Sequence, residues 1–198
     1  MDAMKTLVID RSTKVTSSVL LHEDGALETF DLGIWSQQSP CCHIPPSLGR
    51  IVVGLGPGSF AGIRSALAFA LGWSIGSGAD VRGIVSAVAF AEADKPVAVI
   101  GDARRGKFWV ALFEGYRLVT GIFQVVREDL DRRVPRGVKV VSPDDARIAD
   151  VLKDVFGESY SPAPPLSAEA LAHAFTANPA LLVAEPRPVY LNPAVRCD

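Results

Sequence analysis

The chain has 198 residues and a formal net charge of −2, and 48% of its residues are hydrophobic. A chain of this length and composition can bury a sizeable core, which excludes an intrinsically disordered protein. The near-neutral charge excludes a strongly basic surface that grips nucleic acid unaided, so we expect any contact with RNA to be indirect.

The cysteines and the apolar segments indicate the compartment. The three cysteines, Cys41, Cys42 and Cys197, form neither a disulfide framework nor a zinc-binding spacing, which favours a reducing compartment. The first residues lead directly into a short apolar run and lack the longer run of a signal peptide. No segment approaches the ~18 uninterrupted apolar residues of a membrane span. We therefore expect a cytoplasmic protein with no membrane partner.

The first 32 residues predict an antiparallel meander. Residues 6–9 form an apolar run that ends at Asp10, and residues 15–21 and 27–32 supply two further strands. Asp24-Gly25, between the second and third strands, is a strong hairpin signal. Residues 33–49 contain prolines that exclude a long helix from this segment.

A glycine-rich turn at residues 54–59 lies between a β-branched run and an apolar helical pattern. Its glycines allow positive φ or a close approach of backbones, and Pro57 stiffens the turn. Ser59 stands at the position of an N-cap, where its hydroxyl would accept from the first amides of the helix. A strand that leads through such a turn to a helix N-terminus can bind an anion, or it can be a tight crossover without a ligand.

The helix after this turn is apolar around its whole circumference. Apolar residues at 63, 66, 67, 70 and 71 mark one face at i, i+3 and i+4 spacing, and the opposite face carries Phe69 and Trp73. A helix of this kind must be covered on both sides. One side can pack on a sheet, and the other predicts a second layer or a partner chain.

The second half of the chain repeats the order of elements in the first half. A strand at 97–100 ends at Gly101-Asp102, and a polar turn at 103–106 leads to strands at 108–113 and 118–126. The order of strand, Asp-led turn, strand, glycine turn and strand is the same in both halves. This echo predicts two related halves, residues 1–95 and 96–198, with the tail packing back on the first.

Shorter elements complete the prediction. We expect a strand at 81–85, a short helix at 87–93 capped by Ser86, and a further helix at 127–133. A strand at 138–141 and a helix at 144–156 follow. Ser167 is predicted to cap a helix that ends near Asn178, and the apolar residues 186–191 are predicted to dock on the body of the protein.

The sequence offers few groups for catalysis or metal binding. The three histidines are far apart and form no helical metal-binding pair, so we predict no metal site and no catalytic residue. No lysine follows the glycine turn, which excludes a P-loop. A dinucleotide-type spacing occurs at Gly56, Gly58 and Ala61, but no acidic residue ends the next strand to bind a ribose.

Two Asp-led turns remain as candidates for phosphate binding. Asp10, Ser12 and Thr13 could hold a metal and phosphate oxygens, or they could be an ordinary turn rich in turn-forming residues. The turn after Asp102 carries three cations and is either a solvated hairpin tip or a contact for RNA phosphate or an acidic partner. We predict no required cofactor. The alternative is ATP or ADP with Mg²⁺, bound by Asp10, Ser12, Thr13, Gly56, Gly58, Ser59 and Asp102.

Residues 54–64, GLGPGSFAGIR, resemble the signature GxGPGSFTGxR of the TsaB (YeaZ) family. The order of strands around Asp10, the turn DARRG at 102–106 and the closing PVYL at 188–191 also agree. The resemblance covers nearly the whole chain and implies an α/β, actin-like ATPase fold made of two related subdomains. The chain departs from the family pattern at Arg11, at Ala61 and in the short segment 33–49, where the family carries a long helix.

The resemblance also implies a function. The family supplies a partner subunit for the synthesis of threonylcarbamoyladenosine in tRNA and lacks the metal-binding histidines of its glycoprotease-like relative TsaD, as this chain does. The implied partners are a TsaD-like catalytic subunit, a TsaE-like ATPase or a second copy of the chain, with tRNA reached only through them. We expect the partner interface on the long helix, at Phe60, Ile63, Arg64, Leu67, Phe69 and Trp73. The alternative is an ATP-dependent kinase or ATPase of the same fold that uses Asp10 and Asp102.

Overall fold

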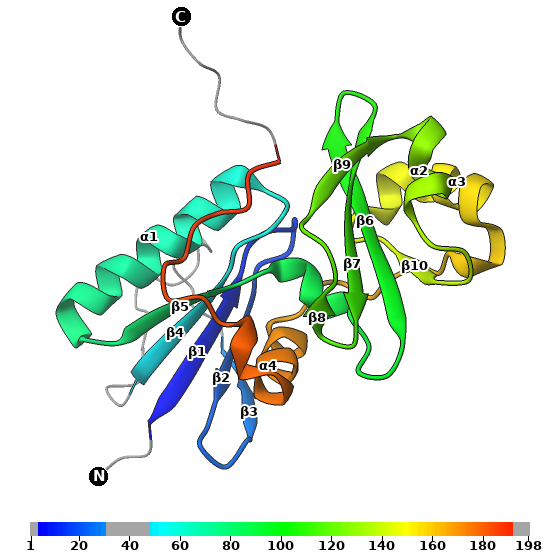
Figure 1. The fold of residues 1–198 in the computed structure, drawn as a ribbon. Coiled ribbons are helices and arrows are strands. Elements are labelled where there is room, and N and C mark those ends of the chain that lie inside the picture. The colour runs from blue at the N-terminus through cyan, green and yellow to red at the C-terminus, as the bar shows by residue number, and fades with distance from the viewer. Residues whose placement is uncertain (1–3, 31–47, 192–198) are drawn as a thin grey trace, which may run out of the picture. The chain divides into compact units, whose positions relative to one another are not determined.

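The computed structural model describes residues 4–30 and 48–191 and divides the chain into two compact units (Figure 1). Unit 1 consists of Met1–Ala89 and Leu166–Pro188, and unit 2 consists of Phe90–Pro165 and Val189–Asp198. The division into residues 1–95 and 96–198, expected from the sequence, stays a prediction. No helix in the described ranges has both the length and the apolar character needed to cross a membrane.

Unit 1 is built on a five-stranded sheet with the order β3-β2-β1-β4-β5. The meander consists of β1 (Lys5–Asp10), β2 (Ser17–Leu21) and β3 (Leu27–Thr29), and each pairs antiparallel with the next. On its other side β1 pairs parallel with β4 (Leu48–Gly54), which pairs parallel with β5 (Asp80–Ile84). The predicted meander is therefore present, although β2 begins two residues later than expected.

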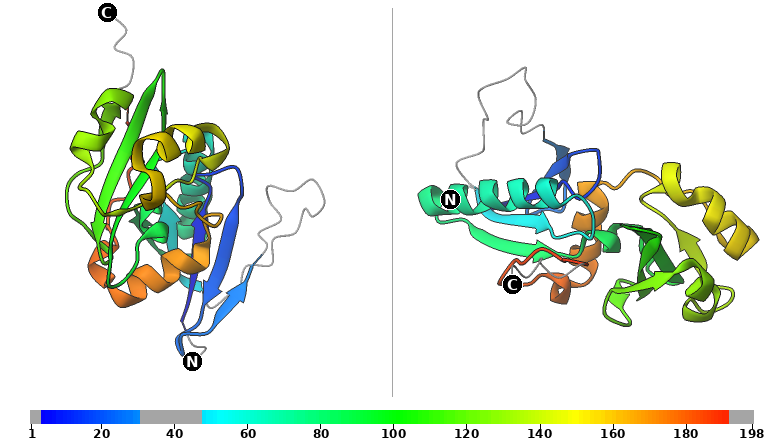
Figure 2. Two further views of the ribbon diagram at one scale, coloured as in Figure 1. Left: turned by 90° about the vertical axis from the view of Figure 1, so that its right-hand side faces the viewer. Right: turned by 90° about the horizontal axis from the view of Figure 1, so that it is seen from above.

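Two helices cover the faces of this sheet. The long helix α1 (Phe60–Ser77) packs on β4, β5 and β1, and α4 (Ala168–Ala177) packs on β1 and β2. Figures 1 and 2 show the two helices on opposite sides of the sheet. Strands covered on both faces need apolar residues at every position, not only at alternate ones. Accordingly Leu7, Val8 and Ile9 of β1 are all fully buried.

The N-termini of both helices lie where the sequence predicts. Ser59 caps α1, and its hydroxyl oxygen accepts a hydrogen bond from the Gly62 amide at 3.2 Å. Ser167 caps α4 in the same way and accepts from the Ala170 amide at 3.1 Å. A cap depends on residues within one turn of each other, so it can be recognised without tertiary information.

Unit 2 contains a sheet with the order β10-β6-β7-β8, and β9 also pairs with β7. The long hairpin of β6 (Pro96–Arg104) and β7 (Lys107–Glu114) forms its centre, and β10 (Lys139–Val141) pairs parallel with β6. The short strands β8 (Arg117–Leu118) and β9 (Phe123–Val126) pair with successive parts of β7.

The core of unit 2 lies between this sheet and the helices α2 (Leu130–Arg133) and α3 (Asp145–Phe156). Its buried residues are Ala98, Ile100, Phe108, Val110, Val125, Leu130, Val134, Val140, Ile148, Leu152 and Tyr160. On the other face of the sheet, Gly101 lies against the indole of the buried Trp109, where a Cβ would overlap the ring.

The two sheets share the order of their antiparallel strands and of the parallel strand next to them, which confirms the duplicated α/β fold. In unit 1 the meander β3-β2-β1 is extended by the parallel strand β4, and in unit 2 the hairpin β7-β6 is extended by the parallel strand β10. A helix follows the parallel strand in each unit, α1 after β4 and α3 after β10. This arrangement is that of the actin-like ATPase type.

Several predicted elements differ in detail. The predicted strand at 118–126 is broken into β8 and β9. The predicted helix at 87–93 is a shorter 3₁₀ helix, Ser86–Phe90, and the helix at 127–133 is a 3₁₀ turn followed by the single turn α2. The predicted irregular segment up to residue 47 and the three cysteines lie outside the described residues.

Candidate functional site

Asp10, at the end of β1, is the centre of a buried polar network in unit 1. Its side chain is fully buried, and its Oδ1 accepts from both the amide and the hydroxyl of Ser12, each at 2.7 Å. Its Oδ2 accepts from the Ser86 hydroxyl at 2.5 Å. Ser86 in turn accepts from the Gly56 amide at 2.9 Å. The carboxyl group therefore ties together the ends of β1, β4 and β5.

The glycine turn closes over this network. A Cβ at Gly54 would overlap the Asp10 carboxyl group, and a Cβ at Gly58 would overlap the Ser12 carbonyl oxygen. The Ser59 amide donates to the same carbonyl at 2.6 Å. The glycines thus allow two backbone segments to touch, so the glycine turn acts as a tight crossover here.

Burial raises the pKa of the Asp10 carboxyl group, because removal from water disfavours the charged form. The hydrogen bonds from Ser86 and Ser12 oppose this effect, since they stabilise the carboxylate. A group held in this way serves as a structural connection. To bind Mg²⁺, Asp10 would have to exchange its present donors for the ion.

The remaining residues of the predicted nucleotide set have other roles. The Thr13 hydroxyl donates to the Val15 carbonyl at 3.2 Å, and Ser59 is exposed and occupied as the cap of α1. Asp102 belongs to unit 2. Arg11, the departure from the family pattern, donates from Nη1 to the Ser65 hydroxyl at 2.6 Å and so links the Asp10 turn to α1.

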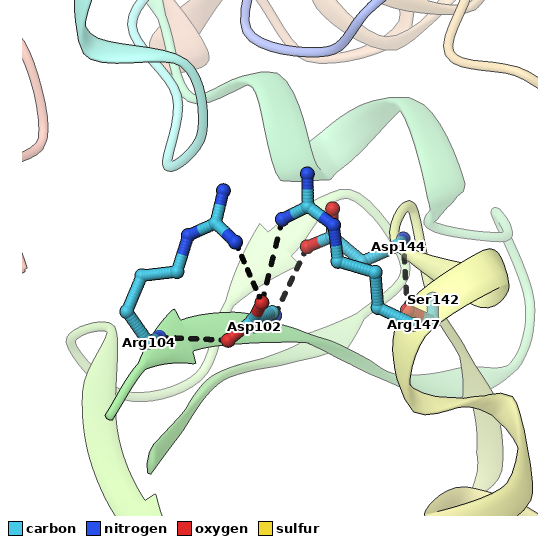
Figure 3. Close-up of polar contacts among 5 residues, drawn as sticks. All are labelled: Asp102, Arg104, Ser142, Asp144 and Arg147. Carbon is cyan, nitrogen blue, oxygen red and sulfur yellow. Dashed lines mark hydrogen bonds and ion pairs between the residues drawn. The ribbon is translucent and has the colours of Figure 1, made fainter. Parts of the chain in front are cut away.

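The Asp102 turn in unit 2 has a different set of neighbours (Figure 3). Asp102 Oδ2 lies 3.3 Å from Nη1 of Arg104 and 3.3 Å from Nη1 of Arg147. Asp102 Oδ1 accepts the Arg104 amide at 2.7 Å. The Asp102 amide donates to Asp144 Oδ2 at 3.0 Å, and the Asp144 amide donates to Ser142 Oγ at 3.0 Å. Sequence reasoning identified Asp102 and Arg104 but missed Arg147 and Asp144, which come from the start of α3.

The long helix α1 contains the predicted partner residues, which differ in how far they are buried. Ile63 and Leu67 are 2% and 7% exposed, so they belong to the core of unit 1 and not to a surface. Phe69 and Trp73 are half-buried and stack on each other, with ring centroids 6.4 Å apart. Phe60 is 55% exposed, and the Arg64 guanidinium lies over its ring.

The outer face of α1 includes two exposed apolar residues. The sequence pattern placed Leu71 on the same face as Ile63 and Leu67 and did not single out Ile75. Leu71 is 50% exposed and Ile75 is 89% exposed. With Phe60, Arg64 and Ala68 they follow i, i+3 and i+4 spacing along one side of the helix, and we call these five residues the α1 stripe.

The sequence of residues 42–171, more than half of the chain, matches the family described as "TsaD: tRNA N6-adenosine threonylcarbamoyltransferase". The chain belongs to this family. The "tRNA threonylcarbamoyladenosine biosynthesis protein TsaB" of Bacillus subtilis is 29% identical over 133 residues, which are 56% of this chain and 56% of that protein. The chain thus matches about half the length of this relative of the family.

Two solved structures resemble the chain over nearly its whole length. YeaZ from Pseudomonas aeruginosa has a TM-score of 0.69 and 19% identity, and the match covers 95% of this chain and 100% of that chain. An uncharacterised protein with similarity to peptidase YeaZ from Pseudomonas aeruginosa also has a TM-score of 0.69, with 17% identity and coverage of 96% and 100%. At these identities the likeness establishes the fold. Together with the TsaB relative, it confirms the resemblance to the TsaB and YeaZ family that residues 54–64 predict.

Proposed function

We propose that the protein is a non-catalytic partner subunit in the threonylcarbamoylation of tRNA adenosine and that it binds a TsaD-like catalytic subunit in the cytoplasm. Membership of the family and the named role of the TsaB relative support the reaction. A TsaE-like ATPase would join through that pair, and the modified adenosine would be handled by the catalytic subunit.

The observation that carries the partner role is the α1 stripe. An isoleucine that is 89% exposed and a leucine that is 50% exposed lie one helical turn apart on the same surface. Burial of such side chains at an interface gains about 25 cal/mol for each Å² of apolar surface. A standard interface buries roughly 800 Å² on each partner, which a long helix and its neighbours can supply.

The polar networks support a non-catalytic role. Asp10 has no exposed surface, and three donors of its own unit already occupy it. Asp102 faces two guanidinium groups, which repel a divalent cation. The ATPase or kinase alternative needs both carboxylates around Mg²⁺, so this geometry favours the partner subunit.

The test is co-purification of the full chain with the TsaD-like chain of its host, followed by titration calorimetry. Leu71→Asp and Ile75→Asp should each weaken the complex by about tenfold or more, because they place a charge in an apolar contact. Val15→Asp is the matched control, since Val15 is an apolar residue of the same unit with 55% exposure and lies outside the α1 stripe.

Three results would contradict the proposal. The first is a strictly monomeric wild-type chain that does not bind the TsaD-like chain in sedimentation. The second is a homodimer formed through the α1 stripe that excludes the TsaD-like chain. The third is hydrolysis of Mg-ATP by the isolated chain that is lost in Asp102→Asn.

A further inference from the structure

Arg104 and Arg147 form a pair of guanidinium groups held by one carboxylate. They come from different elements, the end of β6 and the first turn of α3, and both Nη1 atoms lie 3.3 Å from the same oxygen, Asp102 Oδ2. Figure 3 shows both groups on the same side of Asp102, each with a further nitrogen directed away from it. Two guanidinium groups are thus held by one oxygen, and among the described residues this leaves most of their N–H donors without an acceptor.

The backbone at this place is strained. Arg104 and Arg105 have φ values of 70° and 55°, which are uncommon for residues with a side chain. The hairpin register shifts between Asp102 and Arg104, and the Asp102 carboxylate accepts the Arg104 amide at 2.7 Å. Strain of this kind persists where the surroundings hold it. Here it fixes the direction in which the Arg104 side chain leaves the strand.

Two further cationic residues lie close to Arg104 along the hairpin. Lys107 lies opposite Arg104 across the hairpin, and Arg105 is at its tip. Neither makes an ion pair in the part of the chain that the structure describes. The hairpin tip thus adds two cationic residues, Arg105 and Lys107, beside the guanidinium pair that Asp102 holds. The cations are concentrated at this turn, since the whole chain has a net charge of −2.

We propose that Arg104 and Arg147, positioned by Asp102, bind a phosphate group of an RNA backbone. Guanidinium groups bind phosphate through paired, charge-assisted hydrogen bonds, and a fixed geometry lowers the cost of ordering them. The proposal deepens the proposed function, because it gives the partner subunit a direct contact with tRNA. It replaces the expectation that tRNA is reached only through other subunits.

The exposure of the pair favours a backbone phosphate over a free nucleotide. Side-chain exposure is 65% for Arg104 and 37% for Arg147. Small-molecule sites usually bury 70–90% of their ligand, which needs a deeper enclosure than two such side chains provide. A polymer that crosses the surface can bind this pair and also pass Arg105 and Lys107, and such contacts position RNA without reading its sequence.

The test measures binding of a labelled unmodified tRNA transcript to the full chain by fluorescence anisotropy between low and moderate salt. The double variant Arg104→Ala/Arg147→Ala should bind about tenfold more weakly at low salt. The slope of log K against log salt should fall by about 1 to 2, as expected for the loss of one or two phosphate contacts. Arg147→Lys keeps the charge but loses the planar donor pair, so it should lose much of the same affinity.

Arg117→Ala is the matched control. Arg117 is 66% exposed, pairs with Glu114 in the same unit and lies outside the cluster, so this variant should bind tRNA like the wild type. Equal binding by the wild type and the double variant would overturn the proposal, and so would equal losses in the double variant and Arg117→Ala. A wild-type chain that binds no tRNA at low salt would overturn it as well.

Two further arms distinguish the source of the phosphate. ATP and inorganic phosphate are titrated against wild type and double variant by calorimetry. If ATP binding depends on the pair while tRNA binding does not, the site is a nucleotide site and the RNA proposal fails. Binding of the TsaD-like chain is measured for the same variants and should be unchanged. Loss of tRNA binding with the partner complex intact separates this proposal from the proposed function.

Discussion

The Asp10 turn of unit 1 and the Asp102 turn of unit 2 occupy equivalent places in two sheets with the same order of antiparallel strands. The two aspartate side chains nevertheless contact different groups. Asp10 is the last residue of β1, and Asp102 lies two residues before the end of β6. Each of these strands pairs with a parallel strand, and each aspartate accepts the amide of the residue two positions later at 2.7 Å. Asp10 is fully buried beneath hydroxyl groups. Asp102 is 18% exposed and faces two arginines.

The comparison shows that the same backbone turn can carry different side-chain contacts. The turn is needed in both units because a strand in the middle of a sheet has to reverse into its antiparallel neighbour. The residue two positions after the aspartate differs between the turns and determines what surrounds the carboxylate. Ser12 closes the carboxyl group into the core, whereas Arg104 places a cation on the surface.

The largest expected difference between the two turns is in stability. Asp10→Ala leaves the Ser12 and Ser86 donors buried without an acceptor, so we expect a loss of about 4 kcal/mol in the free energy of unfolding. Asp102→Ala removes partly exposed ion pairs and should cost about 1 kcal/mol. Urea denaturation followed by circular dichroism measures both. Equal losses would show that the two turns are equally structural.

A smaller effect is expected from the space around Asp10. Gly54→Ala places a Cβ against the Asp10 carboxyl group, and the resulting shift should cost about 2–3 kcal/mol. Gly72→Ala is the control, because a Cβ there meets no atom within 4 Å and the residue lies in the middle of α1. We expect that change to stabilise the protein by roughly 0.5–1 kcal/mol. A stable Gly54→Ala variant would contradict the close packing of β4 on Asp10.

The smallest expected effect is a dependence of stability on pH that comes from Asp10. The raised pKa of Asp10 means that the folded state binds more protons than the unfolded state between the ordinary value of 3.8 and the folded pKa. The contribution of Asp10 to stability is therefore greatest below pH 3.8 and decreases as the pH rises through the folded pKa. In Asp10→Asn this contribution should be absent. Denaturation midpoints of both proteins across this range give the difference, and a wild-type curve that rises more steeply than that of the variant would reverse the sign.

Local features of the sequence predicted most of the elements correctly. The N-caps Ser59 and Ser167, the apolar run of β1 and the hairpin at Asp24-Gly25 all depend on residues close together in the chain. The repeated order of elements predicted the duplicated fold, because each half must form its own sheet and core. The signature at 54–64 predicted the resemblance to TsaB and YeaZ proteins.

The tertiary structure alone decided which groups meet. Asp10 and Ser86 are 76 positions apart, and Asp102 and Arg147 are 45 apart, so no local pattern reports either contact. The pattern of α1 is apolar on every side, and only packing on the sheet buried Ile63 and Leu67 and left Leu71 and Ile75 outside. Residues near each other in sequence determine turns and caps through short-range hydrogen bonds. Burial and ion pairing depend on which distant segments the fold brings together.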